Sequence, residues 1–565
     1  MSLNGALSIA SNSLDLFSLG IQVAGNNINN STTAGYVRET LVVQATPPSK
    51  TAGVLVGTGA LAYGIRQQLD NFLEARLHNA NTAVGLTATR SGIYSQLQNV
   101  LQTLNDGDLA SQFNSFMGQL QSVINAPEST SLRTAFVQSA GQFTKTVNQL
   151  SLKLTDLTNS QNNLLKSKVD EANQLIAKVQ KLNPQVGQLE ANGLGRNDAG
   201  ALRVERLNAI NRLSELIPIR AIERPSGEVD LYSGSDYVLM SGQAQELQLV
   251  YDVRNKELPG LQVQLSQTRA MLTTGGGEIR GTIEARDQII GTMSKQLDQW
   301  TANVIHEFNK IQSSGEGLSR FTSLTGVTQV VDATAPLNTI GLAFPPEHGS
   351  FEIKVRNTTS GLIETHQVNV DLDGIGSDTT LQDLASSIGS IANLTATVTT
   401  DGKLQLSSAD GYEFSFANDS SGVLASLGLN TFFTGFDAGS IGVNPLLTAD
   451  SNYLASGQGG GPSDNSNLVA LAQLPDQALD SLGGASLLQY YEQISGGVVQ
   501  AAAAETALAD GALAFRNSLS TQREQTSGVS LDEETINMMR LQRNYQAAAR
   551  MVTVIDQLLN TLLQM

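Results

Sequence analysis

The strongest constraint on the fold of this chain is a pair of matched apolar repeats, one at each end. Each repeat advances in alternating steps of four and three residues, so its members share one face of a helix. The N-terminal seam consists of Leu3, Leu7, Ala10, Leu14, Phe17, Ile21, Ala24 and Ile28. The C-terminal seam consists of Met538, Leu541, Tyr545, Ala548, Val552, Ile555, Leu559 and Leu562. Both ends are therefore predicted to be amphipathic helices, the second with acidic residues 532–534 near its start.

Neither terminal helix is expected to be stable alone. Burying eight seam side chains contributes roughly 12 to 24 kcal/mol gross, whereas ordering about 28 residues costs on the order of 40 kcal/mol. Both helices therefore need partners. Two amphipathic helices packed on a globular core would show the same pattern, so that alternative stays open.

Between the seams, the residue pattern changes several times, which indicates an α+β multidomain protein. Helical periodicity dominates residues 67–190, short strands are predicted at about 217–265, and helix resumes at 278–313. From residue 321 to about 456 the chain is rich in Thr, Gly, Asp and Val, with one short helix after Thr380. We predict a domain of residues 1–66 with 528–565, a helical domain of 67–320 with 463–527, and a β-rich insertion domain of 321–462.

Composition excludes several classes of protein. The net charge of -18 argues against nucleic acid and against anionic membrane surfaces, because both recruit clustered Lys and Arg. The absence of Cys excludes disulfides, thiolate metal sites and a Cys nucleophile. The N-terminus lacks the pattern of a cleaved secretory signal, and no uninterrupted run of about 18 apolar residues predicts a membrane span. With few aromatic residues, packing should rely on aliphatic side chains.

No pattern of catalytic or metal-binding residues stands out. The histidines are His78, His306, His348 and His366, and none forms a helical i, i+4 metal pair with another. Residues 371–378 resemble a calcium loop, but Ile375 and Gln382 occupy positions 5 and 12, where such a loop needs oxygen ligands. A β-turn is the better interpretation. We therefore expect no enzyme, no catalytic residue, no cofactor and no metal.

Motifs near both ends resemble those of the flagellar rod, hook and hook-associated proteins. At the N-terminus these are the segment 24–36, with Asn26, Asn27, Asn29, Gly35 and Tyr36, and at the C-terminus the segments 528–534, 539–550 and 558–563. A long helical region between them, including 281–287 and the pair Phe308 and Asn309, is similar to the FlgK type of hook-associated protein. The resemblance covers most of the chain.

The resemblance implies a structural subunit of the bacterial flagellum that forms the junction between hook and filament and is needed for filament assembly and motility. It implies termini paired as a coiled coil lining an inner tube, with the other domains projecting outward. Expected partners are further copies, the hook protein, the second junction protein, the flagellin-side cap and a cytosolic export chaperone on the C-terminal helix. The protein would be extracellular, exported by the flagellar type III apparatus without a cleaved signal. Two alternatives remain: a hook or filament protein of the same family, and an extracellular adhesin or enzyme with helical stalks.

Overall fold

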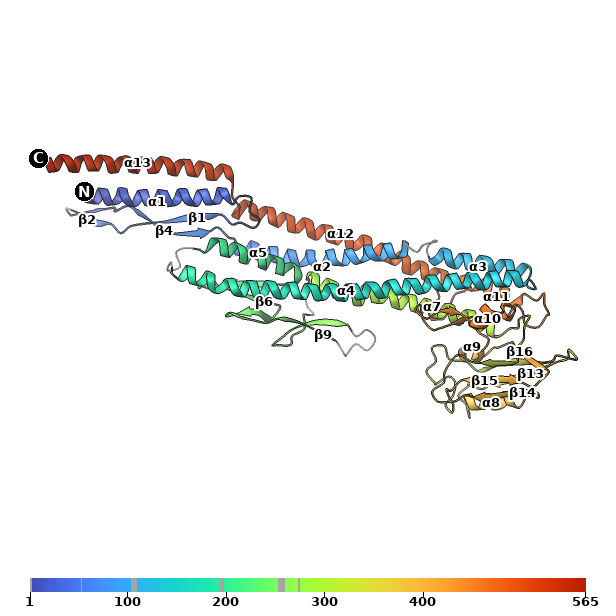
Figure 1. The fold of residues 1–565 in the computed structure, drawn as a ribbon. Coiled ribbons are helices and arrows are strands. Elements are labelled where there is room, and N and C mark those ends of the chain that lie inside the picture. Colours follow the sequence, from blue (N-terminus) through green and yellow to red (C-terminus); the bar gives the residue numbers. More distant parts are fainter. Residues whose placement is uncertain are drawn as a thin grey trace. The chain divides into compact units, whose positions relative to one another are not determined.

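The computed structural model describes residues 3–51, 53–102, 109–192, 198–251, 260–272 and 275–564 (Figure 1). It divides into two compact units. Unit 1 contains residues 1–93, 160–288 and 503–565, and unit 2 contains residues 94–159 and 289–502. This division differs from the three predicted domains, because the terminal segments fall into one unit with part of the helical region. Helices α2 (Asn71–Gln102), α4 (Thr130–Asn192) and α12 (Leu487–Ser527) contribute residues to both units.

The two ends of the chain lie side by side within unit 1 (Figure 1). Helix α1 (Leu3–Asn29) packs against helix α13 (Leu531–Gln564) on one side. On the other side it contacts a long antiparallel ribbon of β1 (Glu39–Ala45) and β4 (Ala60–Gln67). Between those strands the short β2 (Ser49–Thr51) and β3 (Val54–Val56) also pair. Extended structure thus follows the first helix.

The rest of unit 1 packs helices against small antiparallel sheets. Helices α2 and α4 are joined by α5 (Gly200–Leu216) and α6 (Gly277–Glu284), which continues into the π-helical segment η1 (Ala285–Ile290). The predicted small β element is present as six strands in two sheets. These are β5 (Arg220–Glu223), β6 (Val229–Ser233), β7 (Asp236–Met240), β8 (Gln243–Ala244), β9 (Leu247–Tyr251) and β10 (Leu261–Leu265). Their inward faces share one apolar core with α4, α5 and α6.

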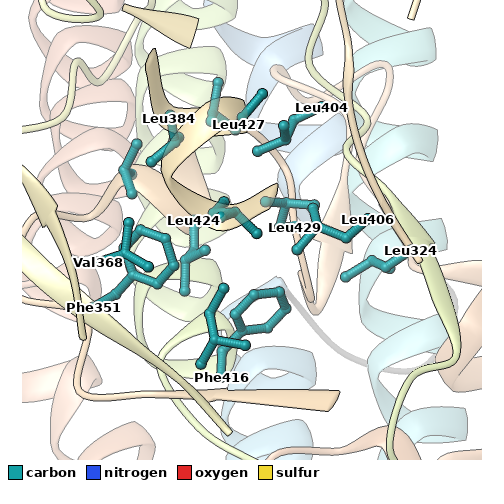
Figure 2. Packing of buried hydrophobic residues seen from close by; sticks show 14 of the residues in the cluster. Leu324, Phe351, Val368, Leu384, Leu404, Leu406, Phe416, Leu424, Leu427 and Leu429 are labelled. Carbon is teal, nitrogen blue, oxygen red and sulfur yellow. The ribbon is translucent and has the colours of Figure 1, made fainter. Parts of the chain in front are cut away.

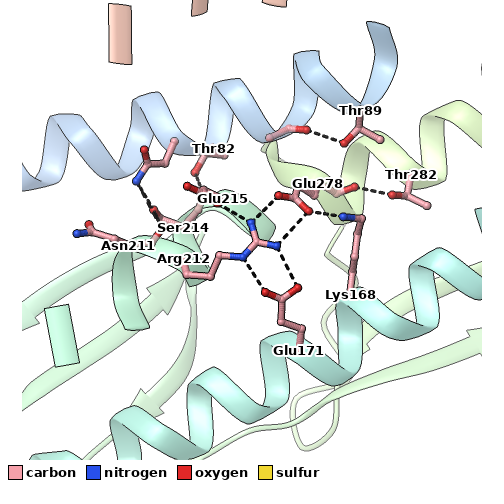
Figure 3. A network of polar contacts seen from close by, with 12 residues as sticks. Thr82, Thr89, Lys168, Glu171, Asn211, Arg212, Ser214, Glu215, Glu278 and Thr282 are labelled. Atoms are coloured by element: carbon pink, nitrogen blue, oxygen red, sulfur yellow. Dashed lines mark hydrogen bonds and ion pairs between the residues drawn. The ribbon is translucent and has the colours of Figure 1, made fainter. Parts of the chain in front are cut away.

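Charged side chains tie these helices together in a network (Figure 3). Arg212 of α5 donates from Nε to Glu171 of α4 at 2.7 Å and from Nη1 to Glu278 of α6 at 2.6 Å. Lys168 also pairs with Glu278. The hydrogen bonds that Arg212 donates to Glu171 and Glu278 raise the pKa of Arg212 above its usual value, although partial burial opposes the shift. Glycine lets α6 approach α2 closely, because a Cβ on Gly281 would lie 2.8 Å from the Cβ of a threonine on α2.

The helical part of unit 2 surrounds an aromatic cluster. Helices α3 (Leu109–Asn125), α4 and α7 (Gly291–Ser313) bring together Phe113, Phe116, Phe136, Phe143, Trp300 and Phe308. Phe116 and Phe136 stack with centroids 5.0 Å apart. The predicted mainly aliphatic packing does not describe this part of the core, where several of the chain's aromatic residues gather. Further helical segments are α11 (Ser466–Gln473), η3 (Leu474–Asp476) and η4 (Asp480–Leu482).

A β-rich region also belongs to unit 2 (Figure 2). One sheet has the order β13-β12-β16 and the other the order β11-β15-β14. Leu, Val and Phe side chains from both sheets and from α8 fill the space between them. Helix α8 begins after Thr380, which forms a capping box with Asp383, so the predicted Thr cap is confirmed. The elements are β11 (Ser323–Thr325), β12 (Gly349–Asn357), β13 (Ile363–Val370), α8 (Leu381–Gly389), β14 (Leu394–Val398), β15 (Leu404–Ser408), β16 (Tyr412–Ala417) and α9 (Val423–Ser426).

The segment after α9 packs against helices, and Tyr453 near its end also stacks on Phe321 of the β-rich region, with ring centroids 4.9 Å apart. It comprises β17 (Phe433–Thr434), β18 (Gly442–Val443), α10 (Pro445–Ala449) and η2 (Ser451–Tyr453). Phe432 and Phe433 join the aromatic cluster, and the side chain of Asn309 on α7 accepts hydrogen bonds from both of their backbone amides. Arg133 of α4 is fully buried and donates to the carbonyl of Leu454 at 2.7 Å. The predicted β-rich insertion domain of residues 321–462 thus includes a segment that also contacts the helices of unit 2.

Candidate assembly site at the paired chain ends

The paired helices α1 and α13 run antiparallel. A Cβ on Gly20 would lie 3.1 Å from the side chain of Leu541, and a Cβ on Gly25 would lie 3.8 Å from that of Met538. As the residue number increases along α1, the number of the residue that it contacts on α13 decreases. Both ends of the chain consequently lie at the same end of the pair (Figure 1). The glycines let the two helices approach closely at this point.

Most residues of both predicted seams lie on covered faces. Ala10 and Ala24 of the N-terminal seam and Ala548 and Ile555 of the C-terminal seam are buried. The other seam residues are half-buried, except Tyr545 and Leu562, which are exposed. The pairing of the ends matches the expectation, whereas the supercoiled packing of a coiled coil stays a prediction.

Helix α1 has a second buried face that the heptad pattern did not identify. Leu16, Val23 and Asn27 are buried although they lie outside the N-terminal seam. This face belongs to the side covered by the ribbon, since a Cβ on Gly20 would also lie 3.6 Å from Leu41 of β1. This second face contains small and polar residues as well as apolar ones, so an apolar repeat does not identify it in the sequence.

Helix α13 carries a second apolar stripe, and this one is exposed. We call it the outer stripe: Ile536, Met539, Met551, Val554, Leu558 and Leu562, whose exposed fractions lie between 48% and 63%. Its last four members recur at steps of three and four residues, so they share one helix face. Only Leu562 belongs to both the outer stripe and the predicted seam. The pairing with α1 therefore leaves α13 with a large uncovered apolar surface.

The family-type Asn-rich segment forms the connection between α1 and the ribbon. The buried amide of Asn27 donates to the backbone carbonyl of Glu39 at 2.8 Å and accepts from the backbone amide of the same residue at 3.0 Å. Tyr36 donates its hydroxyl to the Asn27 amide oxygen at 3.0 Å. Asn26 donates to the Glu39 carboxylate at 3.1 Å. The side chain of Asn27 thus pairs with the β1 backbone as a neighbouring strand would.

Two other motif residues have different environments. Gly35 has φ +75, a backbone conformation that favours glycine. A Cβ there would lie 2.0 Å from the side-chain oxygen of Asn208, so that side chain would have to move. Asn29 is exposed and has no side-chain hydrogen bond to another described residue. Its neighbour Asn30, which the prediction omitted, donates instead to the Asn26 carbonyl at 3.0 Å.

Ion pairs join this connection to the C-terminal helices. Arg38 donates from Nε to Glu534 of α13 at 2.7 Å, and its backbone amide donates to the last carbonyl of α12, that of Ser527, at 2.8 Å. Arg523 of α12 pairs with Glu74 of α2. Sequence reasoning noted Glu534 only as an acidic residue at a helix start, and its pairing with a residue 496 positions away has no local signal.

Burial governs the titration of the groups at this connection. Burial first, and then the nearby carboxylates of Glu39 and Glu534, raise the pKa of Tyr36, so its hydroxyl stays protonated and donates. Burial also raises the pKa of Glu74, although Arg523 opposes the shift. Burial lowers the pKa of His78 to about 4, which keeps its imidazole neutral at pH 7. These groups support a structural connection, and no nucleophile is paired with a base among them.

The helical stretch from Leu487 to Leu562 is long and apolar enough, by length and composition only, to cross a membrane. The sequence analysis expected no such stretch. Its most apolar window has a mean hydropathy of 1.2 and is only 17% buried.

Comparison with known proteins identifies the family. Residues 94–323 match the model of the flagellar hook-associated protein FlgK helical domain, and residues 521–565 match the C-terminal model of the flagellar basal body rod FlgEFG proteins. The chain is 25% identical to flagellar hook-associated protein 1 of Bacillus subtilis, with 98% of this chain and 96% of the relative covered. It is 24% identical to the protein of the same name from Escherichia coli, with 98% of each covered. The fold is similar to that of the flagellar hook junction protein FlgK from Burkholderia pseudomallei, with a TM-score of 0.52 at 13% identity over 81% of this chain and all of the other. The chain belongs to the FlgK family of flagellar hook-associated proteins.

Proposed function

We propose that this protein is a structural, non-enzymatic subunit of the bacterial flagellum that forms the junction between hook and filament. The names of its relatives support this role. The observation that carries the mechanism is the outer stripe of α13, because a helix with one covered and one uncovered apolar face needs a second partner. In this proposal, neighbouring axial subunits supply that partner.

The area of the outer stripe is large enough to contribute to assembly. Burying its six side chains completely would stabilise an assembly by roughly 9 to 18 kcal/mol, and about half of that remains available, since each is about half exposed. The neighbours would be further copies of this chain, the hook protein, the second junction protein and the flagellin-side cap.

The same surface would need protection before assembly. We therefore include in the proposal a cytosolic chaperone that covers the C-terminal helix, and export through the flagellar type III apparatus to the extracellular tip without a cleaved signal. An apolar stripe of this size on a free subunit would otherwise promote aggregation.

Adjacent residues of α13 allow a matched test. Val554 is 53% exposed on the outer stripe, whereas Ile555 is 5% exposed and faces the covered side. Val554→Asp should leave the structure of the subunit unchanged and prevent its incorporation, because the charge would be buried against a neighbour. Ile555→Asp should disturb the contact with α1 as well. Gln557→Asp, at an exposed polar position, is the control.

Incorporation is measured by locating the labelled protein on intact flagella and by motility. The proposal expects loss of label and of swimming with Val554→Asp and normal behaviour with Gln557→Asp. Normal junctions with Val554→Asp would refute the role of the outer stripe. A label distributed along the whole hook or filament would favour the alternative of a hook or filament protein.

A further inference from the structure

We propose that the β-rich region of unit 2 binds a divalent transition-metal ion of the zinc class through His348, Asp371 and Asp373. Each of these side chains offers one ligand atom, and the three atoms lie within 4.8 Å of one another. This site is separate from the chain ends and from the assembly role proposed above.

Strand register explains why these residues meet. In the β12–β13 hairpin Gly349 pairs with Val370, so the flanking residues His348 and Asp371 face each other beyond the last pair. The following loop is held in place, because the Thr379 amide donates to the Asp371 carbonyl at 2.7 Å. The sequence analysis dismissed His348 and the 371–378 loop separately. The hairpin makes them a single cluster.

The contact between His348 and Asp371 needs a hydrogen or a metal ion between its two heavy atoms. The imidazole Nδ1 lies 3.1 Å from Asp371 Oδ1 and accepts a hydrogen bond from the Leu372 amide at 3.3 Å. An Nδ1 that accepts a hydrogen bond carries a lone pair and no hydrogen. Nδ1 and the carboxylate oxygen are then two acceptors in contact, and they repel each other. A proton or a metal ion between them removes this repulsion. The hollow beside them, of about 420 Å³, has neither Lys nor Arg among its lining residues His348, Gly349, Ser350, Asn369, Val370 and Asp371.

The donor set selects the kind of ion. An imidazole nitrogen with two carboxylates suits zinc and similar first-row ions, whereas calcium takes six to eight oxygen ligands. Asp373 is oriented by the hydrogen bond from the Ile375 amide to its Oδ1 at 2.8 Å, which leaves Oδ2 for a metal. Asp378 accepts from the Gly374 amide. The side chains of His348 and Asp371 are 58% and 52% exposed, so water would complete the coordination.

The test is a calorimetric titration of the full-length protein with zinc chloride, with calcium chloride as the comparison ion. We expect zinc binding that weakens about tenfold or more in His348→Gln and in Asp371→Asn. His366→Gln is the matched control, because His366 lies in the same hairpin, 3.8 Å from the carboxylate of Glu364, and is in no cluster of three ligands among the described residues. It should leave zinc binding unchanged. Thermal unfolding followed by circular dichroism verifies that each variant is folded.

A second readout locates the ion. The chain has four histidines, so their imidazole proton resonances can be assigned with single variants. Paramagnetic cobalt should broaden the His348 resonance strongly and leave that of His366 much less affected. Unchanged zinc binding in His348→Gln would overturn the proposal. The absence of zinc binding to the unmodified protein at millimolar concentration would also overturn it, and would mean that only a proton lies between His348 and Asp371. Tighter binding of calcium than of zinc would overturn it as well.

Discussion

Arg133 offers a sharp test of how the segment after α9 is attached to the helices of unit 2. Its guanidinium is fully buried at the start of α4 and donates to the carbonyls of Pro127 and Leu454 and to the hydroxyl of Ser456, at 2.5, 2.7 and 2.7 Å. Arg133→Met removes all of these donors and leaves two carbonyls without their partner. Two orphaned buried acceptors cost about 1 to 3 kcal/mol each, and the lost charged hydrogen bonds add to this. We expect unit 2 to be destabilised by about 3 to 5 kcal/mol.

The single tryptophan provides the assay. Trp300 is buried in the aromatic cluster of the same unit, where its ring lies 5.9 Å from that of Phe113, so its fluorescence reports the unfolding of unit 2. The urea midpoint should fall by about 1 M or more if the dependence on urea is about 3 kcal/mol per molar. Lys145→Met is the control, because it removes a basic residue from an exposed position of the same helix. Equal midpoints for the two variants would refute the reasoning.

Three further predictions address the two units. The terminal segments should be largely disordered in the free monomer, so limited proteolysis should remove about residues 1–67 and 527–565. Leu14→Asp should leave the melting temperature of the resistant core unchanged and yet stop incorporation, and protection of both ends from hydrogen exchange would contradict this. Replacing residues 328–427 with a short linker should preserve filament growth and the urea midpoint reported by Trp300, because the two ends are already close: the Val327 amide donates to the Gly428 carbonyl at 3.2 Å. Replacing residues 321–456 should lower that midpoint, because it also removes Phe432 and Phe433. Burial holds the pKa of His78 at about 4 in the folded protein, below its unfolded value of about 6.5. The linked contribution to the free energy of unfolding, about 3 kcal/mol, is present above pH 6.5 and lost as the pH falls toward 4. His78→Gln should remove this slope in unfolding followed by circular dichroism.

Local patterns predicted the elements of this fold well. The two seams identified the terminal helices, and the Thr380 cap identified the start of α8, because caps and helical periods depend on residues a few positions apart. On α4, Phe136 and Phe143 recur at a spacing of seven residues, which puts them on one helix face, and both are buried. In each case the physical cause lies within one element.

Contacts between distant residues could not be predicted in the same way. The pairing of Arg38 with Glu534 depends on the antiparallel return of the chain, and the contact of His348 with Asp371 depends on a hairpin register. The segment of Phe432 and Phe433 resembles its β-rich surroundings in composition, although its contacts are with helices. Composition describes what a segment is made of, and it does not identify the surface that the segment covers.

The outer stripe of α13 explains why one heptad pattern was not enough to describe the assembly site. Arg543 and Ala547 occupy the positions between Met539 and Met551 on the steps of four, so the stripe is interrupted in the sequence. A search for a continuous repeat therefore finds the seam that pairs within the chain and misses the stripe that faces outward. A stable monomer would not retain six half-exposed apolar side chains on one helix without a use for them. In the proposed assembly, α13 pairs with α1 and buries its second face against neighbouring subunits together, which agrees with terminal segments that are disordered in the free monomer.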